Sequence, residues 1–259
     1  MIKQFLKRRL KSLLTFVGIN PALLRMRYWK ERKQWLQQGG KITKLYPITC
    51  EYNEDAGKAS GHYYHQDLLV ASYIHQRKPP RHIDVGSFNI GFVAHLASFR
   101  EVEVMDIRPL KPSIHQNIKF FQADLMQPYQ QEITESLSCL HAIEHFGLGR
   151  YNDPIDVNGH IKGITNLIQM LKPQGILYIS FPIGKKDEVH FNAHRVFHPL
   201  SLFDYPSVKQ HLKLIKFDYV DDQGNLHLDG KTEDAVDKFI MGCGIYTFQK
   251  NLNSHAKRL

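Results

Sequence analysis

Cysteine is scarce in this sequence. The 259 residues include three cysteines, Cys50, Cys139 and Cys243, which are widely spaced and form no CxxC pair. An odd number of scattered cysteines supports neither a disulfide framework nor a zinc-finger-type site. We therefore expect a protein of a reducing compartment, the cytoplasm.

Long hydrophobic runs are also missing. No apolar stretch approaches the roughly 18 residues that a membrane-spanning helix needs. The apolar stretch at residues 13–17 is too short for the h-region of a secretory signal. With 42% hydrophobic and 23% charged residues, the composition is typical of a globular protein.

Acidic residues are almost absent from residues 1–46, which hold twelve Lys and Arg beside a single acid. Apolar residues recur there at helical spacing, over 2–17 and again over 22–38. We therefore expect a basic amphipathic helical extension over residues 1–45, ahead of a main domain over residues 46–259.

Two interpretations of this extension stay open. A basic helix with aromatic residues suits an anionic membrane surface, so residues 1–38 are candidates for a peripheral contact at the inner face of the membrane. In the alternative, the helices pack on the main domain and keep their lysines in water. The chain after residue 46 carries a net charge of −2, so no basic patch continues there and nucleic-acid binding is not expected.

In the main domain, short apolar strands alternate with helices. The expected strands span residues 83–85, 102–107, 118–124, 137–141, 175–182, 212–220 and 239–248. The expected helices span residues 68–74, 92–99, 158–171 and 199–211. This order predicts an α/β fold with a doubly wound, mostly parallel Rossmann-like sheet of about seven strands and an antiparallel edge.

The turn after the first strand is the first candidate for ligand binding. Gly86 and Gly91 bracket a turn that leads into a helix at Phe92. Glycine lets the backbone approach a ligand closely, and a helix N-terminus offers free N–H groups. A strand, a glycine-containing turn and a helix open many nucleotide-binding domains, although the same unit also occurs as plain scaffolding.

Three acids end, or nearly end, successive strands: Asp84, Asp106 and Asp124. In an open α/β sheet, ligands bind outside the carboxyl ends of the strands. Asp106 follows Asp84 at about the spacing where an acid meets ribose hydroxyls, and Asp124 is placed to lie near a base. The alternative for each acid is a helix cap or a turn residue.

These motifs resemble the class I S-adenosylmethionine-dependent methyltransferases over roughly residues 81–250. The family's glycine-rich loop corresponds to residues 84–91, its second-strand acid to Asp106, and its adenine-contacting motif to Ala123-Asp124-Leu125. Phe88 stands where the family has its middle glycine. The resemblance implies S-adenosylmethionine as the cofactor, bound by Asp84, Gly86, Ser87, Gly91, Asp106 and Asp124.

A second resemblance is more specific. The segments His62-Tyr-Tyr-His-Gln-Asp67 and Glu144-His-Phe-Gly-Leu-Gly-Arg-Tyr151 are similar to the uncharacterised domain-of-unknown-function-268 family. That family carries the methyltransferase-like fold but has no settled reaction. Its bacterial members tend to occur with surface-polysaccharide genes, which implies a saccharide or glycolipid as the acceptor.

The loop after the fourth strand holds the candidate catalytic residues. In the methyltransferase interpretation this loop faces the transferred methyl group, and a histidine suits removal of the acceptor's proton. We expect His145 to be that base, with Glu144 orienting it or binding the donor's amino-acid end. Arg150 and Tyr151 are candidates to hold the acceptor. The alternative is that Glu144 and His145 only cap the loop.

No metal site is expected. His141-Ala-Ile-Glu-His145 has the letters of an inverted zincin motif, which needs a helix to place both histidines on one face. His190, His194 and His198 repeat every four residues, which also requires a helix. Both segments read as strand and loop.

Two functions therefore compete. The first is an S-adenosylmethionine-dependent methyltransferase that acts on a hydroxyl of a saccharide or glycolipid in surface-polysaccharide synthesis, which the His145 loop favours. The second is a non-catalytic protein of the same fold that binds or assembles components of that pathway, which Phe88 favours.

Overall fold

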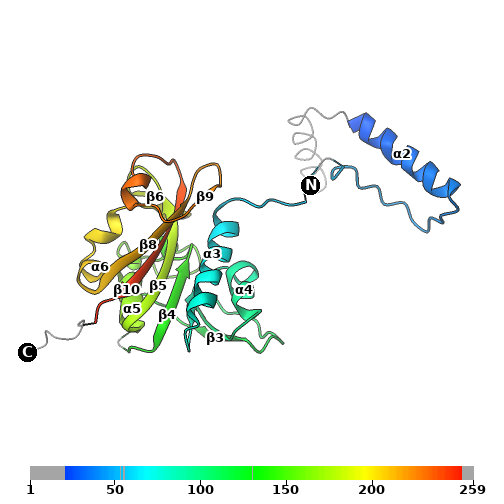
Figure 1. The fold of residues 1–259 in the computed structure, drawn as a ribbon. Coiled ribbons are helices and arrows are strands. Elements are labelled where there is room, and N and C mark those ends of the chain that lie inside the picture. The colour runs from blue at the N-terminus through cyan, green and yellow to red at the C-terminus, as the bar shows by residue number, and fades with distance from the viewer. Residues whose placement is uncertain (1–20, 53, 55, 130, 253–259) are drawn as a thin grey trace, which may run out of the picture. The chain divides into compact units, whose positions relative to one another are not determined.

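The computed structural model describes residues 21–52, 54, 56–129 and 131–252, and its contacts divide the chain into a first unit, residues 1–58, and a second unit, residues 59–259 (Figure 1). The first predicted helix, over residues 2–17, lies outside the described residues. None of the helices in the described ranges is long and apolar enough to cross a membrane.

The first unit contains helix α2, Pro21–Gln37, which confirms the second predicted helix. Its apolar side chains do not share one face, and Met26, Trp29 and Trp35 are 67%, 53% and 55% exposed. Beyond the helix, the Tyr52 hydroxyl donates to the carboxylate of Glu31. Helix α2 therefore lacks the amphipathic stripe that the sequence predicts for the extension.

The second unit is built on an eight-stranded sheet with the order β3-β2-β1-β4-β5-β10-β8-β9 (Figure 1). The strands are β1 Ile83–Val85, β2 Val102–Asp106, β3 Ile118–Gln122, β4 Thr134–Leu140, β5 Leu171–Ile183, β8 Leu212–Val220, β9 Leu226–His227 and β10 Gly242–Lys250. Strands β1 to β5 pair in parallel, β10 runs antiparallel between β5 and β8, and β9 adds a short antiparallel edge. The predicted mostly parallel, Rossmann-like sheet is confirmed.

Helices cover both faces of the sheet. They are α3 His62–Arg77, α4 Ala94–Ala97, α5 Gly159–Met170 and α6 Pro206–His211, with single turns at η1 Asn89–Val93, η2 Ile143–His145, η3 Ser201–Asp204 and η4 Thr232–Ala235. One buried apolar cluster joins α5 and α6 to the sheet, and a second joins α3 and α4 to it. The two clusters make the fold doubly wound, as expected from the alternation of strands and helices.

Several segments differ from the sequence prediction, and the largest differences lie before and within residues 199–211. The helix expected over residues 199–211 is split into η3 and α6, because Pro206 has no N–H and starts a new helix. The residues before it form a small separate sheet of β6, Glu188–His190, and β7, His194–Val196, which pair antiparallel.

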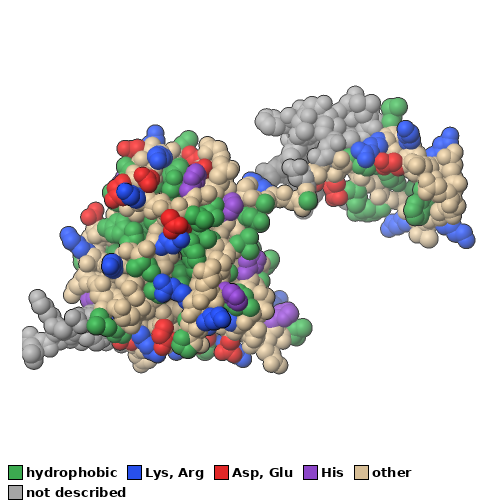
Figure 2. All heavy atoms as spheres, viewed as in Figure 1, with side chains coloured by type: hydrophobic (Ala, Val, Ile, Leu, Met, Phe, Trp, Pro, Cys, Tyr) green, Lys and Arg blue, Asp and Glu red, His purple; other side chains and the backbone are tan. Residues whose placement is uncertain are grey.

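Charged side chains of both signs are interspersed over the visible face of the second unit (Figure 2). This face therefore shows no basic patch of the kind that nucleic-acid-binding proteins present.

Candidate functional site

A pocket opens at the carboxyl ends of β1, β2 and β4, where the order of the strands reverses. Open α/β sheets bind their ligands at this switch point. The polar residues that line the pocket are Asp106, Arg108, Asp124, His141, His145, Tyr151 and Asp153. Its apolar wall includes Met105, Leu125, Met126 and Phe146. Two of the predicted cofactor acids and the predicted base therefore share one pocket.

The turn after β1 needs a glycine at Gly86 but not at Phe88. Gly86 lines the pocket with φ +72°, and a Cβ there would lie 2.9 Å from the Cβ of Ala142. Phe88 has φ −74° and ψ 120°, an ordinary extended conformation that needs no glycine, and its side chain is 57% exposed. The departure at Phe88 is thus compatible with the backbone of the turn.

Gly91 is required for a different reason. A Cβ at Gly91 would lie 2.2 Å from Oδ2 of Asp67, a buried carboxylate on α3. The backbone N–H of Phe92 donates to this carboxylate, so the expected free N–H groups at this helix start are partly occupied by the protein itself. Burial raises the pKa of Asp67 to about 7. Gly91 does not line the pocket, and its contact with Asp67 is structural.

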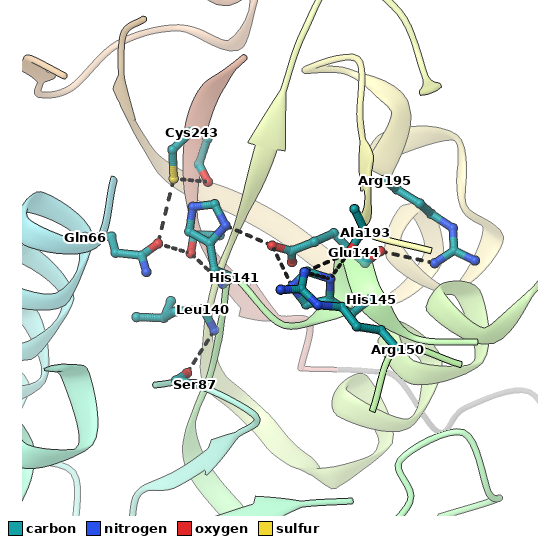
Figure 3. Close-up of polar contacts among 12 residues, drawn as sticks. Gln66, Ser87, Leu140, His141, Glu144, His145, Arg150, Ala193, Arg195 and Cys243 are labelled. Carbon is teal, nitrogen blue, oxygen red and sulfur yellow. Dashed lines mark hydrogen bonds and ion pairs between the residues drawn. The ribbon is translucent and has the colours of Figure 1, made fainter. Parts of the chain in front are cut away.

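Asp84 and Ser87 do not line the pocket either. The fully buried carboxylate of Asp84 accepts hydrogen bonds from the hydroxyls of Ser87 and Ser138, each at 2.6 Å, and from the Ser87 N–H at 3.2 Å. The Ser87 hydroxyl in turn accepts the N–H of Leu140 at 3.1 Å (Figure 3). These contacts join the turn after β1 to strand β4.

The same network continues into the sheet. Because the Ser138 hydroxyl gives its proton to Asp84, it accepts from Nε2 of His82 at 3.0 Å. Nδ1 of His82 then accepts from the hydroxyl of Ser136 at 2.8 Å. Burial lowers the pKa of His82 to about 3, so this ring is neutral.

Asp106 lies at the end of β2 and lines the pocket, as predicted. Its carboxylate is held by the guanidinium of Arg108, with Nε at 2.9 Å and Nη2 at 2.5 Å. The same guanidinium stacks over the ring of Tyr151 at 4.2 Å. Arg108 is a pocket residue that sequence reasoning missed, although its position two residues after the acid could have signalled it.

Asp124 lines the pocket from the turn after β3. Oδ1 accepts the N–H of Met126 at 2.9 Å, and Oδ2 accepts from the side chain of Gln127 at 3.2 Å. The carboxylate therefore also shapes its own turn, which was the alternative interpretation of this residue.

His145 is oriented by a contact from a distant segment. Nδ1 of its ring donates to the carbonyl of Ala193 at 2.8 Å, and Nη1 of Arg150 donates to the same carbonyl at 2.8 Å (Figure 3). Because a carbonyl oxygen only accepts, Nδ1 carries the proton and Nε2 keeps a free electron pair. Burial lowers the pKa of His145 below its ordinary value, so the ring is neutral near pH 7. A neutral imidazole with a free Nε2 is able to take a proton.

Glu144 is buried beside the pocket and contacts two histidines. Its Oε1 lies 2.8 Å from Nδ1 of His141 but 3.7 Å from Nε2 of His145. Although burial raises it, the adjacent His141 lowers the pKa of Glu144, which is therefore ionised. These distances indicate that Glu144 orients His141 more directly than it orients His145, the residue we expected it to orient.

His141 departs from its predicted position inside a strand. Strand β4 ends at Leu140, and His141 adopts the left-handed conformation with φ 47°. The ring is turned into the pocket wall between Glu144 and Cys243 (Figure 3). The prediction was wrong by one residue. The sequence has no glycine or proline at this point that would have marked the end of β4 at Leu140.

The loop that carries His145 is held by two further polar residues. Asp153 accepts the N–H groups of Gly147 and Gly149 at 2.9 and 3.2 Å. The buried Arg195 on β7 donates to the carbonyls of Glu144 and Phe146, at 3.3 and 2.7 Å. Neither was predicted to hold this loop, and the role of Arg195 depends on a contact some fifty positions along the chain.

The two histidine patterns take the conformations expected of them. His145 lies in the single turn η2 and not in the helix that a zincin requires. His190 and His194 are cross-strand partners in the β6–β7 sheet.

Solved structures with a similar fold agree with this architecture. N-methyltransferase NodS from Bradyrhizobium japonicum WM9, in complex with S-adenosyl-L-homocysteine, is 12% identical, with 77% of this chain and 93% of that chain covered and a TM-score of 0.50. The [4+2]-cyclase SpnF is 14% identical, with 83% and 91% covered and a TM-score of 0.51. The chain has the class I methyltransferase fold.

The model of the family described as Caenorhabditis protein of unknown function, DUF268, matches residues 111–220. This is the family that the sequence resembles, and the matched stretch contains the Glu144–Tyr151 run. None of the curated proteins matches the sequence. The class I methyltransferase fold thus explains where the pocket lies, while the reaction depends on the residues that line it.

We expect the Asp84→Asn substitution to lower the free energy of unfolding by about 1.5–3 kcal/mol, because an amide offers N–H groups where the carboxylate accepts charge-assisted hydrogen bonds. Urea unfolding followed by circular dichroism measures the change. Asp124→Asn is the matched control, since the amide oxygen still accepts in a partly exposed turn, and its loss should stay below about 1 kcal/mol. An equal loss in both variants would contradict the structural role of Asp84.

Proposed function

We propose that the protein is an S-adenosylmethionine-dependent methyltransferase that acts on a hydroxyl group. The observation that carries the proposal is the single pocket in which Asp106, Asp124 and His145 meet. Acids at the ends of β2 and β3 suit a nucleoside, and a neutral histidine suits removal of a hydroxyl proton.

The pocket residues fit the parts of S-adenosylmethionine. Asp106 has two carboxylate oxygens that can accept hydrogen bonds from the ribose hydroxyls. This requires that Arg108, which now donates to both oxygens, moves away. Met105, Leu125 and Met126 give an apolar wall for adenine, next to Asp124. NodS, which shares the fold, is in complex with S-adenosyl-L-homocysteine in its own structure.

His145 supplies the base in this proposal. S-adenosylmethionine provides the methyl group, which moves in an in-line displacement at carbon, so the protein has to align the two reactants and accept a proton. Nε2 of His145 takes the hydroxyl proton, and the Ala193 carbonyl holds the ring through Nδ1–H. Arg150 and Tyr151 adjoin this ring and are the contacts that we propose for the acceptor.

The acceptor class that we propose is a saccharide or glycolipid in surface-polysaccharide synthesis, which follows from the resemblance to the domain-of-unknown-function-268 family. Tyr151, whose ring packs edge-on against His145 with centroids 5.4 Å apart, is the aromatic side chain that we propose for contact with the sugar ring.

A specific contact favours the alternative, a non-catalytic binding or assembly protein of the same pathway. Arg108 already occupies the carboxylate of Asp106 and would compete with a nucleoside. The fold also serves other chemistry, since one similar structure is a [4+2]-cyclase. Binding of S-adenosylmethionine separates the two proposals.

The binding test compares two substitutions at the ion pair. Asp106→Ala is expected to weaken S-adenosylmethionine binding about 10- to 150-fold, the effect of losing a charge-assisted bond of about 1.5–3 kcal/mol. Arg108→Met also breaks the ion pair but leaves the carboxylate, so its affinity should equal or exceed that of the unchanged protein. Titration calorimetry measures both. No binding by the unchanged protein, or equal weakening in both variants, would overturn the assignment of Asp106.

The second test concerns the base. His145→Gln should lower turnover roughly 100- to 10,000-fold, the range for a lost general base, while leaving donor affinity nearly unchanged. Turnover of the unchanged protein should rise with pH through a group that titrates below about 6.5, because the neutral ring is the active form and burial lowers its pKa. Labelled donor and a panel of sugar nucleotides and lipid-linked saccharides provide the assay. Full turnover in His145→Gln would place the base elsewhere.

We also propose that residues 1–38 contact anionic membranes, on the strength of the many Lys and Arg in this segment. Each basic residue near such a surface contributes about 1 kcal/mol, and salt screens the attraction. Flotation with phosphatidylserine vesicles should therefore show binding that falls as salt is added. Equal flotation of the full chain and of a chain lacking residues 1–38 would rule the contact out.

A further inference from the structure

Three side chains of the types that bind transition metals lie close together, and one of them, His141, lines the pocket, although the sequence predicts no metal site. One ligand atom each of His62, His141 and Cys243 lies within 4.8 Å of the other two. They come from the start of α3, the turn after β4 and the start of β10, so the fold gathers them from three separate elements. We infer that His62, His141 and Cys243 form a binding site for a zinc-type transition metal ion.

The first support is the ring nitrogen of His141 that faces Cys243. Nε2 of His141 is buried, makes no hydrogen bond of ordinary geometry within the described structure, and has the thiol of Cys243 as its nearest polar contact. A thiol is a weak hydrogen-bond partner, whereas an imidazole nitrogen and a thiolate that face each other can bind one metal ion. Figure 3 shows the ring of His141 between Cys243 on one side and Glu144 on the other.

The second support is the contact behind the histidine. Nδ1 of His141 lies 2.8 Å from Oε1 of Glu144, whose side chain is 1% exposed. A metal-binding histidine commonly donates its other ring N–H to a carboxylate, which sets the tautomer and aims the free nitrogen at the metal. Glu144 is therefore a positioning residue for His141, which explains why its short contact goes to this ring and not to His145.

The donor set and the spacing both fit zinc. A thiolate with two imidazoles is a combination that Zn²⁺ takes. At the usual bond lengths, tetrahedral coordination places ligand atoms about 3.3–3.8 Å apart, so closing the cluster needs side-chain shifts of about 1 Å. The rings of His62 and His141 stack with their centroids 5.3 Å apart, so the two imidazoles already lie side by side.

Three protein ligands leave a fourth position for water or another oxygen ligand, which is the pattern of an open zinc site. Binding requires Cys243 as the thiolate and His141 without a proton on Nε2, so protons from these groups are released when a metal ion binds. His141 also lines the pocket, and the metal would therefore stand in its wall. The inference does not depend on the proposed methyl transfer.

The test uses Co²⁺ as a spectroscopic substitute for Zn²⁺, added to the full-length protein after treatment with a chelator. The unchanged protein should bind one Co²⁺ with a thiolate-to-metal absorption band, and Zn²⁺ should displace it. Cys243→Ser should lose the band, and His62→Asn should weaken binding roughly 100-fold or more. His62 is partly exposed at a helix start, so its variant tests the site even if Cys243→Ser fails to fold.

Matched controls come from the same chain. Cys50→Ser removes an exposed thiol and His65→Asn a histidine one helical turn from His62, and both should bind Co²⁺ as the unchanged protein does. Glu144→Gln should keep the band but weaken binding about 10- to 100-fold, as expected for a residue that positions a ligand. A missing band in the unchanged protein, or a band that survives Cys243→Ser or is lost in Cys50→Ser, would overturn the site.

Discussion

The carboxylate of Asp84 is the contact on which the arrangement of the pocket depends. It lies fully buried in β1 and stays there because Ser87 and Ser138 direct their hydroxyl groups at it. A buried carboxylate tolerates few other arrangements, since each lost donor leaves charge without compensation. The turn after β1 and the strand β4 are therefore held at one distance, and the loop that carries His145 starts from the end of that strand.

Much of the fold could be predicted because its signals are local. Strand β1 was predicted at its observed bounds, since Ile83 and Val85 are followed directly by Gly86, which marks a turn in the sequence. Two features could not be predicted in this way. The position of β10 between β5 and β8 depends on contacts between segments that are far apart in the sequence, and the strands of the small β6–β7 sheet have only three residues each. Such short strands depend on tertiary contacts more than on propensity.

The site could be predicted in part. Asp106 and Asp124 reach the pocket because strand ends of a parallel sheet converge, which is a rule of topology. Asp84 looks the same in sequence but points into the sheet, and the serines that hold it could not be recognised in advance. The proximity of His62 and Cys243 could not be predicted at all, because more than 170 residues separate them and no spacing rule connects such distant positions.

The contacts from Ala193 and Arg195 to the loop that carries His145 have a consequence for the order in which the site is completed. The acids of the pocket lie on β2 and the turn after β3, whereas the ring of His145 takes its orientation from Ala193 and its loop from Arg195. During synthesis Asp106 and Asp124 therefore emerge well before the segment that orients His145. A chain that has emerged only as far as β5 has both acids but lacks Ala193 and Arg195, so the contacts that orient the ring form only after the chain has reached residue 195.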